Sequence, residues 1–276
     1  MNRSEVVLLS ITVLWGLTFP AMKVSLDYLP PILFLAYRFG IAALLMLLIF
    51  RSRVLKRETV REGFLLGLTL FFGHGFQIVG LEYTTASNSA FITSLYVVFT
   101  PFIAYPLLGE RVRWRDLISL SIALTGLYLI SGAGSSIGYG DLLTALCAVS
   151  FAFQIVLVQR FGEGDYLSLA FWQIFWNFVF SLAFALLFEP KVFPRNALPW
   201  LGLGYTAVFG TVVAFTLQLK FQRCTTAYRA ALIYSMEPVF GSLSAFILLG
   251  ERLTERALIG AFFILAGVWN EIRKKG

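Results

Sequence analysis

Glu237 lies near the middle of a long apolar stretch of this chain, and Pro238 follows it directly. A carboxylate that is surrounded by hydrocarbon must be neutral, paired or hydrated. Proline removes a backbone donor and frees a carbonyl one turn earlier, so the two residues form a polar notch in an apolar helix. Such a notch is typical either of a proton-coupling or substrate-contacting group, or of a structural carboxylate that holds a broken helix together.

His74 is the one histidine of the chain and lies between Gly73 and Gly75 in a second apolar stretch. Its neutral form is readily buried, and its charge changes near physiological pH. No cysteine or carboxylate stands beside it at the spacing of metal ligands, so we expect no metal site. Proton sensing is one interpretation, and a buried, hydrogen-bonded histidine is the one we favour. Gln77 follows at i+3 and shares the same face of a helix.

Aromatic and amide side chains recur together in other apolar stretches. Trp172 and Trp176 stand four residues apart and share one face of a helix. Aromatic walls with a few amides suit a cavity for flat or amphipathic molecules, although ordinary packing is the alternative in a chain that is 16% aromatic. The substrate-binding candidates are Trp15, Phe19, His74, Gln77, Tyr96, Gln154, Trp172, Trp176 and Asn177.

The composition places these residues in a membrane. Of 276 residues, 58% are hydrophobic and 13% are charged, and the mean hydropathy is +0.80. Soluble domains are about half apolar and about a quarter charged, so we expect an all-α, polytopic integral membrane protein. Ten stretches have the length of a transmembrane helix; they lie near 4–23, 31–50, 63–81, 84–108, 117–132, 141–159, 166–188, 198–219, 227–249 and 257–271.

Lysine and arginine are distributed unevenly between the two ends of these stretches. Ten spans put both termini on one side, which receives 16 of the 22 basic residues. Positive residues stay on the cytoplasmic side, so we expect a multi-pass protein of the cell inner membrane or plasma membrane with cytoplasmic termini and Ser135 outside. This bias explains the net charge of +7 without a nucleic acid partner. Lys23 and Arg38 belong to the outer set, where they either steer an anionic group or, more commonly, snorkel to the headgroups.

Residues 84–126 and 225–267 repeat one another without a gap at an offset of 141, and 19 of 43 positions are identical. The two halves, 1–133 and 139–276, contain five spans each. Because five is an odd number, the second half must be inverted in the membrane. Inverted repeats give a membrane protein two related states around a site near the midplane, which is the basis of alternating access.

Two details of the repeat carry structural expectations. Glu110 and Glu251 belong to the repeated sequence LLGER, and we expect each near the start of the next helix, where the helix dipole favours it. Pro238 has Val97 as its counterpart in the first copy, where the proline is instead Pro101. A kink in the first copy should therefore be displaced from its position in the second.

The chain resembles the drug/metabolite transporter superfamily, specifically its EamA-type members, over nearly its whole length. The matching segments are WGLTF at 15–19 with Lys23, YR at 37–38, the stretch 83–101, GER at 109–111 and 250–252, GD at 140–141 and MEPVF at 236–240. The resemblance implies a ten-helix secondary transporter that moves small metabolites, often outward.

Patterns for catalysis and for nucleotide hydrolysis do not occur in the sequence. It contains no H-E-x-x-H, G-x-S-x-G or G-x-x-x-x-G-K-[ST]. GYGD at 138–141 resembles part of an intramembrane aspartyl protease, but the other aspartates lie near span ends, and Asp141 is better interpreted as an N-cap. Cys147 and Cys224 stand far apart and predict packing rather than a disulfide. We therefore expect no enzyme and no cofactor.

These observations favour a secondary transporter, most plausibly an exporter of small organic metabolites such as amino acids or aromatic compounds. The small-molecule substrate and membrane lipids are then its partners, with protons as a further partner if Glu237 couples transport to them. A flippase for a lipid or lipid-linked sugar on the same scaffold is the first alternative. An intramembrane enzyme is a disfavoured second.

Overall fold

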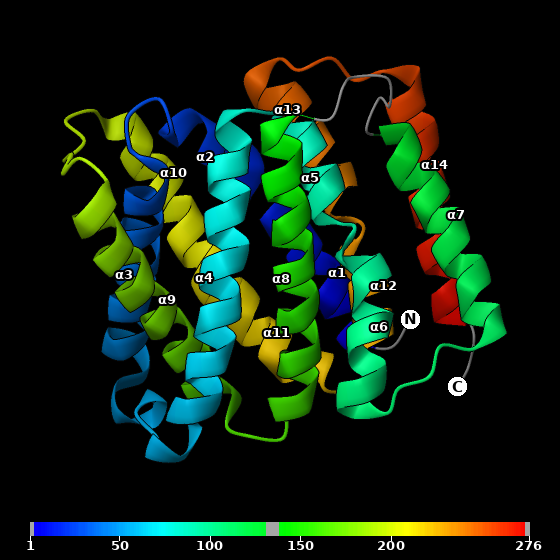
Figure 1. The fold of residues 1–276 in the computed structure, drawn as a ribbon, viewed down its shortest axis with the longest axis horizontal. Helices are drawn as coiled ribbons and strands as arrows, with labels where there is room; N and C mark the ends of the chain where they lie inside the picture. Colours follow the sequence, from blue (N-terminus) through cyan, green and yellow to red (C-terminus); the bar gives the residue numbers. More distant parts are fainter. Residues whose placement is uncertain (1–2, 131–137, 274–276) are drawn as a thin grey trace.

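The protein is a bundle of long helices that run side by side (Figure 1). The computed structural model describes residues 3–130 and 138–273, and every regular element in these ranges is helical. The first half contains α1 (Arg3–Gly16), α2 (Thr18–Ser25), α3 (Pro31–Phe50), η1 (Arg51–Val54), η2 (Arg57–Thr59), α4 (Val60–Glu82), α5 (Ala86–Thr93), α6 (Tyr96–Leu108) and α7 (Trp114–Ile130). The second half contains α8 (Tyr139–Phe161), α9 (Tyr166–Phe188), α10 (Ala197–Ala207), the π-helix η3 (Val208–Val213), α11 (Ala214–Gln222), α12 (Ala227–Tyr234), α13 (Glu237–Leu249) and α14 (Glu255–Arg273).

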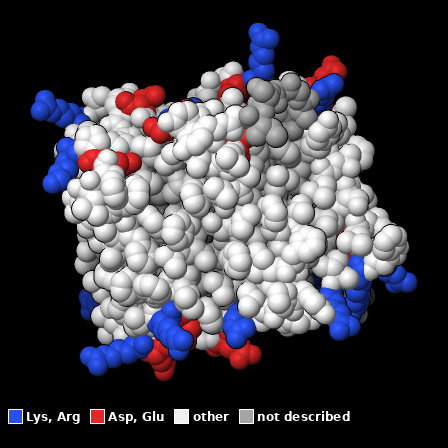
Figure 2. Space-filling view, viewed as in Figure 1, with Lys and Arg blue, Asp and Glu red and all other residues white. Residues whose placement is uncertain are grey.

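The helices are long and apolar enough for a multi-pass membrane protein. Eight helical segments of the described chain meet the length and composition of a membrane span. The fifth and tenth expected spans are α7, which has only 17 residues, and α14, which carries charged residues at both ends. Both are consistent with ten helices. Charged side chains gather at the two ends of the bundle, and the face between them is nearly free of charge (Figure 2).

The two outermost helices of the halves, α7 and α14, pack on each other through glycine (Figure 1). Gly126 of α7 contacts the backbone carbonyl of Gly260 on α14, and Gly260 contacts the carbonyl of Gly126. Gly267, the repeat equivalent of Gly126, lies against the carbonyl of Ser119. Small residues let backbones approach closely, which is the main source of packing between helices in lipid.

Four of the spans are interrupted, and two of the interruptions are equivalent. The fourth span breaks between α5 and α6, and the ninth breaks between α12 and α13 at the same repeat position. The expected displacement of the first kink toward Pro101 is therefore wrong, because Pro101 lies inside α6. Ser94 and Ser235, identical in the two copies, occupy the breaks and bond to carbonyls of the preceding turn, at 3.0 Å to Ala90 and 2.6 Å to Leu232.

Each LLGER glutamate caps a helix of the opposite half, and not the next helix as expected. Glu251, after α13, accepts the N–H of Ala86 at 3.2 Å and the hydroxyl of Ser87 at 2.6 Å, at the start of α5. Glu110, after α6, accepts the N–H of Ala227 at 3.0 Å, at the start of α12. The start of α5 thus lies beside the end of α13, and the start of α12 beside the end of α6, so the fourth and ninth spans run in opposite directions.

Asp141 also has a capping role, but three residues into its helix rather than at the N-cap. Its carboxylate accepts the N–H of Gly138 at 2.9 Å and the amide of Asn88 at 2.6 Å. Asp141 therefore ties the start of α8 to α5. Ser135, whose outer location the charge bias predicts, lies outside the described residues.

The swapped caps should contribute measurably to stability. We expect Glu110→Ala and Glu251→Ala each to lower the melting temperature of the purified protein in detergent, because a lost N-terminal cap costs about 0.5–2 kcal/mol. Glu163→Ala removes an exposed carboxylate from the connection between α8 and α9 and is the matched control. Equal melting temperatures for Glu163→Ala and Glu251→Ala would contradict the capping role.

Candidate functional site

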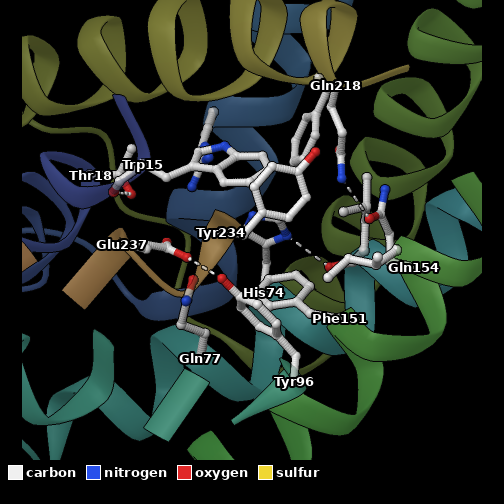
Figure 3. A pocket seen from close by; sticks show the side chains of 14 residues that line it. Trp15, Thr18, His74, Gln77, Tyr96, Phe151, Gln154, Gln218, Tyr234 and Glu237 are labelled. Atoms are coloured by element: carbon white, nitrogen blue, oxygen red, sulfur yellow. Dashed lines mark hydrogen bonds between the residues drawn. The ribbon is translucent and has the colours of Figure 1, made fainter. Parts of the chain in front are cut away.

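A small cavity lies where the interrupted helices of the two halves meet (Figure 3). Tyr96 and Glu237 are the first residues of α6 and α13, and both face it. The centre of a water molecule can move through about 40 Å³ of this space, which accommodates about three waters. Pockets that hold organic ligands are several times larger, at roughly 300–1,000 Å³. The cavity in this structure is therefore smaller than a site that holds an organic ligand.

Six sequence candidates line this cavity together: Trp15, His74, Gln77, Tyr96, Gln154 and Glu237. They come from α1, α4, α6, α8 and α13. Glu237, Gln77 and Tyr96 group on one side, and Gln154 lies on the other with Gln218 (Figure 3). That these residues bind substrate stays a prediction, but their common placement agrees with the expected space between the halves.

Glu237 is buried with weak hydrogen bonding. Its side chain is 6% exposed, and the hydroxyl of Tyr96, 3.4 Å away, is its one hydrogen-bond partner among the described residues. This distance is longer than the 2.5–3.0 Å of a normal O–H···O bond. The carboxylate begins α13, where the helix dipole favours negative charge. It is thus held in place mainly by its position at the start of α13.

His74 is fixed by a backbone contact and by aromatic rings. Its Nδ1 lies 3.0 Å from the carbonyl of Leu70, so Nδ1 donates and Nε2 is left as the acceptor. The rings of Phe39, Phe151 and Phe215 surround the imidazole with centroids 5.0–5.9 Å away. This is the hydrogen-bonded, buried histidine that the sequence favoured, and it presents Nε2 as an acceptor.

Side-chain amides continue from the cavity as a connected chain. Gln218 of α11 donates to Gln154 at 3.3 Å and to Gln222 at 3.2 Å. Gln154 donates to Gln173 of α9 at 3.4 Å, and the hydroxyl of Tyr234 donates to Gln222 at 3.2 Å. These contacts join helices of the second half around the polar side of the cavity.

Arg38 lies in the cavity wall and not at the headgroups, so the favoured snorkelling is wrong. The residue is 1% exposed. Its Nε donates to the hydroxyl of Thr211 at 2.8 Å and its Nη2 to the carbonyl of Gly210 at 3.3 Å, both on the π-helix η3. Lys23 is half-buried, and its Nζ donates to the carbonyl of Leu81 in the last turn of α4 and to that of Thr84 just beyond this helix.

Four candidates lie elsewhere. Trp172 and Trp176 place their Cβ atoms against Gly63 and Gly67 of α4, outside the cavity wall. The indole of Trp172 donates to the carbonyl of Lys56 at 3.1 Å. Two further candidates, Asn177 and Phe19, are fully buried in packing contacts away from the wall. Trp172 and Trp176 thus pack on a neighbouring helix, which was the alternative interpretation.

Sequence reasoning missed several lining residues, namely Thr18, Phe215, Gln218 and Tyr234. One signal could have found two of them. At the repeat offset of 141, Gln77 corresponds to Gln218 and His74 to Phe215. Tyr96 and Glu237 are also equivalent at this offset, and they contact each other. Equivalent residues that touch must lie on the axis relating the two halves, so extending the repeat upstream of residue 84 predicts the wall.

Known proteins resemble this chain over its full length. The model of the EamA-like transporter family matches it twice, at residues 3–132 and 138–270. An uncharacterized transporter of Archaeoglobus fulgidus is 39% identical over 94% of this chain and 82% of its own length. A protein of Salmonella typhimurium named as a probable amino-acid metabolite efflux pump is 27% identical over 99% of this chain and 96% of its own.

A solved crystal structure shares the fold, with a TM-score of 0.79 at 20% identity over 98% of this chain and 97% of that one. The fold, the paired halves and the double family match agree with one another. The chain belongs to the EamA-like transporter family.

Proposed function

We propose that this protein is a secondary transporter that exports small organic metabolites, such as amino acids or aromatic compounds, by alternating access. The observation that carries the proposal is the cavity at the helix breaks, which both halves line with repeat-equivalent residues. Interrupted helices at a repeat interface are where secondary transporters bind their cargo. The name of the Salmonella relative, a probable amino-acid metabolite efflux pump, supports both the direction and the substrate class.

The cavity suits a compact molecule with apolar and polar parts. Rings of Trp15, Phe151 and Phe215 form one kind of surface, and the amides of Gln77 and Gln154 form another. An aromatic wall with few polar groups recognises flat or amphipathic ligands. Because the present space is too small for such a ligand, binding must accompany a movement of one half against the other.

The indole of Trp15 should matter for substrate binding. It lines the cavity and donates to the carbonyl of Gly210 at 3.1 Å. In a screen of amino acids and aromatic amines against purified protein, a ligand that raises the melting temperature identifies a substrate class, because a ligand stabilises the state it binds. We expect Trp15→Phe to reduce that rise.

Trp176→Phe is the matched control, since Trp176 lies outside the cavity and its indole Nε1 has no hydrogen-bond partner among the described residues. It should leave the ligand-induced rise unchanged. If the two variants respond alike, the cavity is not the binding site.

Proton coupling through Glu237 is part of this proposal. A buried carboxylate on the axis can take up a proton from one side and release it to the other as access alternates. Glu237→Gln keeps the shape of the protonated acid but cannot release a proton. In proteoliposomes, this variant should retain substrate exchange and lose uphill transport driven by a pH gradient. Wild-type flux that ignores an imposed gradient would instead identify a facilitator, with Glu237 as a structural residue.

The proposed location is the inner or plasma membrane of the cell. The proposed orientation puts both termini and the connection between α11 and α12 in the cytoplasm. Cys224 lies in that connection and is exposed, whereas Cys147 is buried. A membrane-impermeant maleimide should therefore label the native protein only after the cells are opened. Arg195 is exposed in the connection before α10. A double variant, Arg195→Cys with Cys224→Ser, should be labelled in intact cells. The reverse pattern would invert the topology.

A further inference from the structure

Arg38 is a buried cation without a counter-ion. The described residues form two ion pairs, Lys56 with Asp165 and Arg229 with Glu271, and Arg38 belongs to neither. Its hydrogen-bond partners are a hydroxyl, a carbonyl and, at 3.6 Å, the sulfur of Met22, and its Cζ lies 5.3 Å from the centre of the Phe39 ring. A charge at this depth is expensive unless it is paired. An apolar side chain of the same length would avoid this cost of burying a charge.

The N–H groups of the guanidinium are only partly engaged. Arginine carries five N–H groups, and three are engaged by Thr211, Gly210 and Met22. The remaining two, one on Nη1 and one on Nη2, have no partner among the described residues. Two such groups in one plane match the two oxygens of a carboxylate. Since Arg38 is part of the cavity wall, a ligand there can reach them.

The π-helix η3 explains how this orientation arises. Thr211 donates its hydroxyl to the carbonyl of Thr206, five residues back, at 2.8 Å, and this leaves its oxygen as an acceptor for Arg38. The carbonyl of Gly210 accepts both from Arg38 and from the indole of Trp15. π-Helical turns of this kind occur frequently at functional sites. Here the irregular turn supplies two acceptors that point the cation at the cavity.

We propose that Arg38 binds a carboxylate of the transported molecule, so that the cavity selects metabolites with an acid group next to an apolar or aromatic body. The inference rests on the proposed transport function and adds the residue that determines specificity. Glu237 lines the same cavity and is not within ion-pair distance of Arg38. The two charges therefore stay separate, and Arg38 is left for the ligand.

Three related compounds test the proposal: L-phenylalanine, phenethylamine, which lacks the carboxylate, and 3-phenylpropionate, which lacks the amine. Binding to purified protein is measured for the wild type and for Arg38→Met. The wild type should bind the two acids more tightly than phenethylamine. Arg38→Met should weaken the acids by roughly 10- to 100-fold, the value of a charge-assisted hydrogen bond, and change phenethylamine little. Arg38→Lys, which keeps the charge without the planar fork, should retain part of the acid preference.

Lys23→Met is the matched control, because Lys23 is a cation of the adjacent span that bonds to backbone carbonyls outside the cavity. It should leave the preference for acids intact even if the melting temperature falls. A uniform loss of affinity for all three compounds in Arg38→Met, or no loss, would overturn the proposal and leave Arg38 as a structural support of η3. If the wild type transports amines or neutral compounds and shows no preference for acids, the role of Arg38 is wrong but the proposed transport function stands. Failure to transport any metabolite would defeat the proposed function.

Discussion

Backbone groups inside a bilayer have no water to bond with, and this constraint governs the whole structure. An unbroken helix forms all its backbone hydrogen bonds internally, except at its ends. An interrupted span leaves N–H and carbonyl groups that must bond to protein side chains instead. Ser94 and Ser235 meet carbonyls at the breaks of the fourth and ninth spans. Trp15 and Arg38 meet the carbonyl of Gly210. The second pair lines the cavity, so one set of contacts both repairs the backbone and forms the site.

The duplicated halves keep their scaffold alike and differ where they meet. The LLGER segments, the serines at the breaks and the glycine pair Gly126 and Gly267 recur in both copies. On the axis, Tyr96 faces its equivalent Glu237 at 3.4 Å. A second glutamate in place of Tyr96 would set two carboxylates against each other, and like charges that close oppose ionisation of both. Divergence at the axis therefore allows a single acid to occupy the centre of a nearly symmetric protein.

The apolar stretches and the repeat predicted the fold well, because lipid imposes length and apolarity on every span. All ten expected spans correspond to described helices, and Glu237 does lie at an interruption. The residues that sequence reasoning placed wrongly are those whose direction depends on a neighbour. Arg38 lies about two turns from the outer end of α3, yet its hydrogen bonds are to η3, and a π-helical turn has no clear sequence signal. Trp172 and Trp176 face α4 because of glycines more than a hundred residues earlier.

The exchange of caps also sets an order in which the chain can be assembled. The N–H of Ala86 bonds to Glu251, which is 165 residues later in the chain, and Glu110 accepts the N–H of Ala227, which is 117 residues later. At a synthesis rate of about 5–20 residues per second, the start of α5 emerges roughly 8–33 seconds before its partner exists. During that interval the first half is a membrane-inserted fragment with an exposed backbone end. Each half therefore has one helix whose N-terminal cap is supplied by the other half.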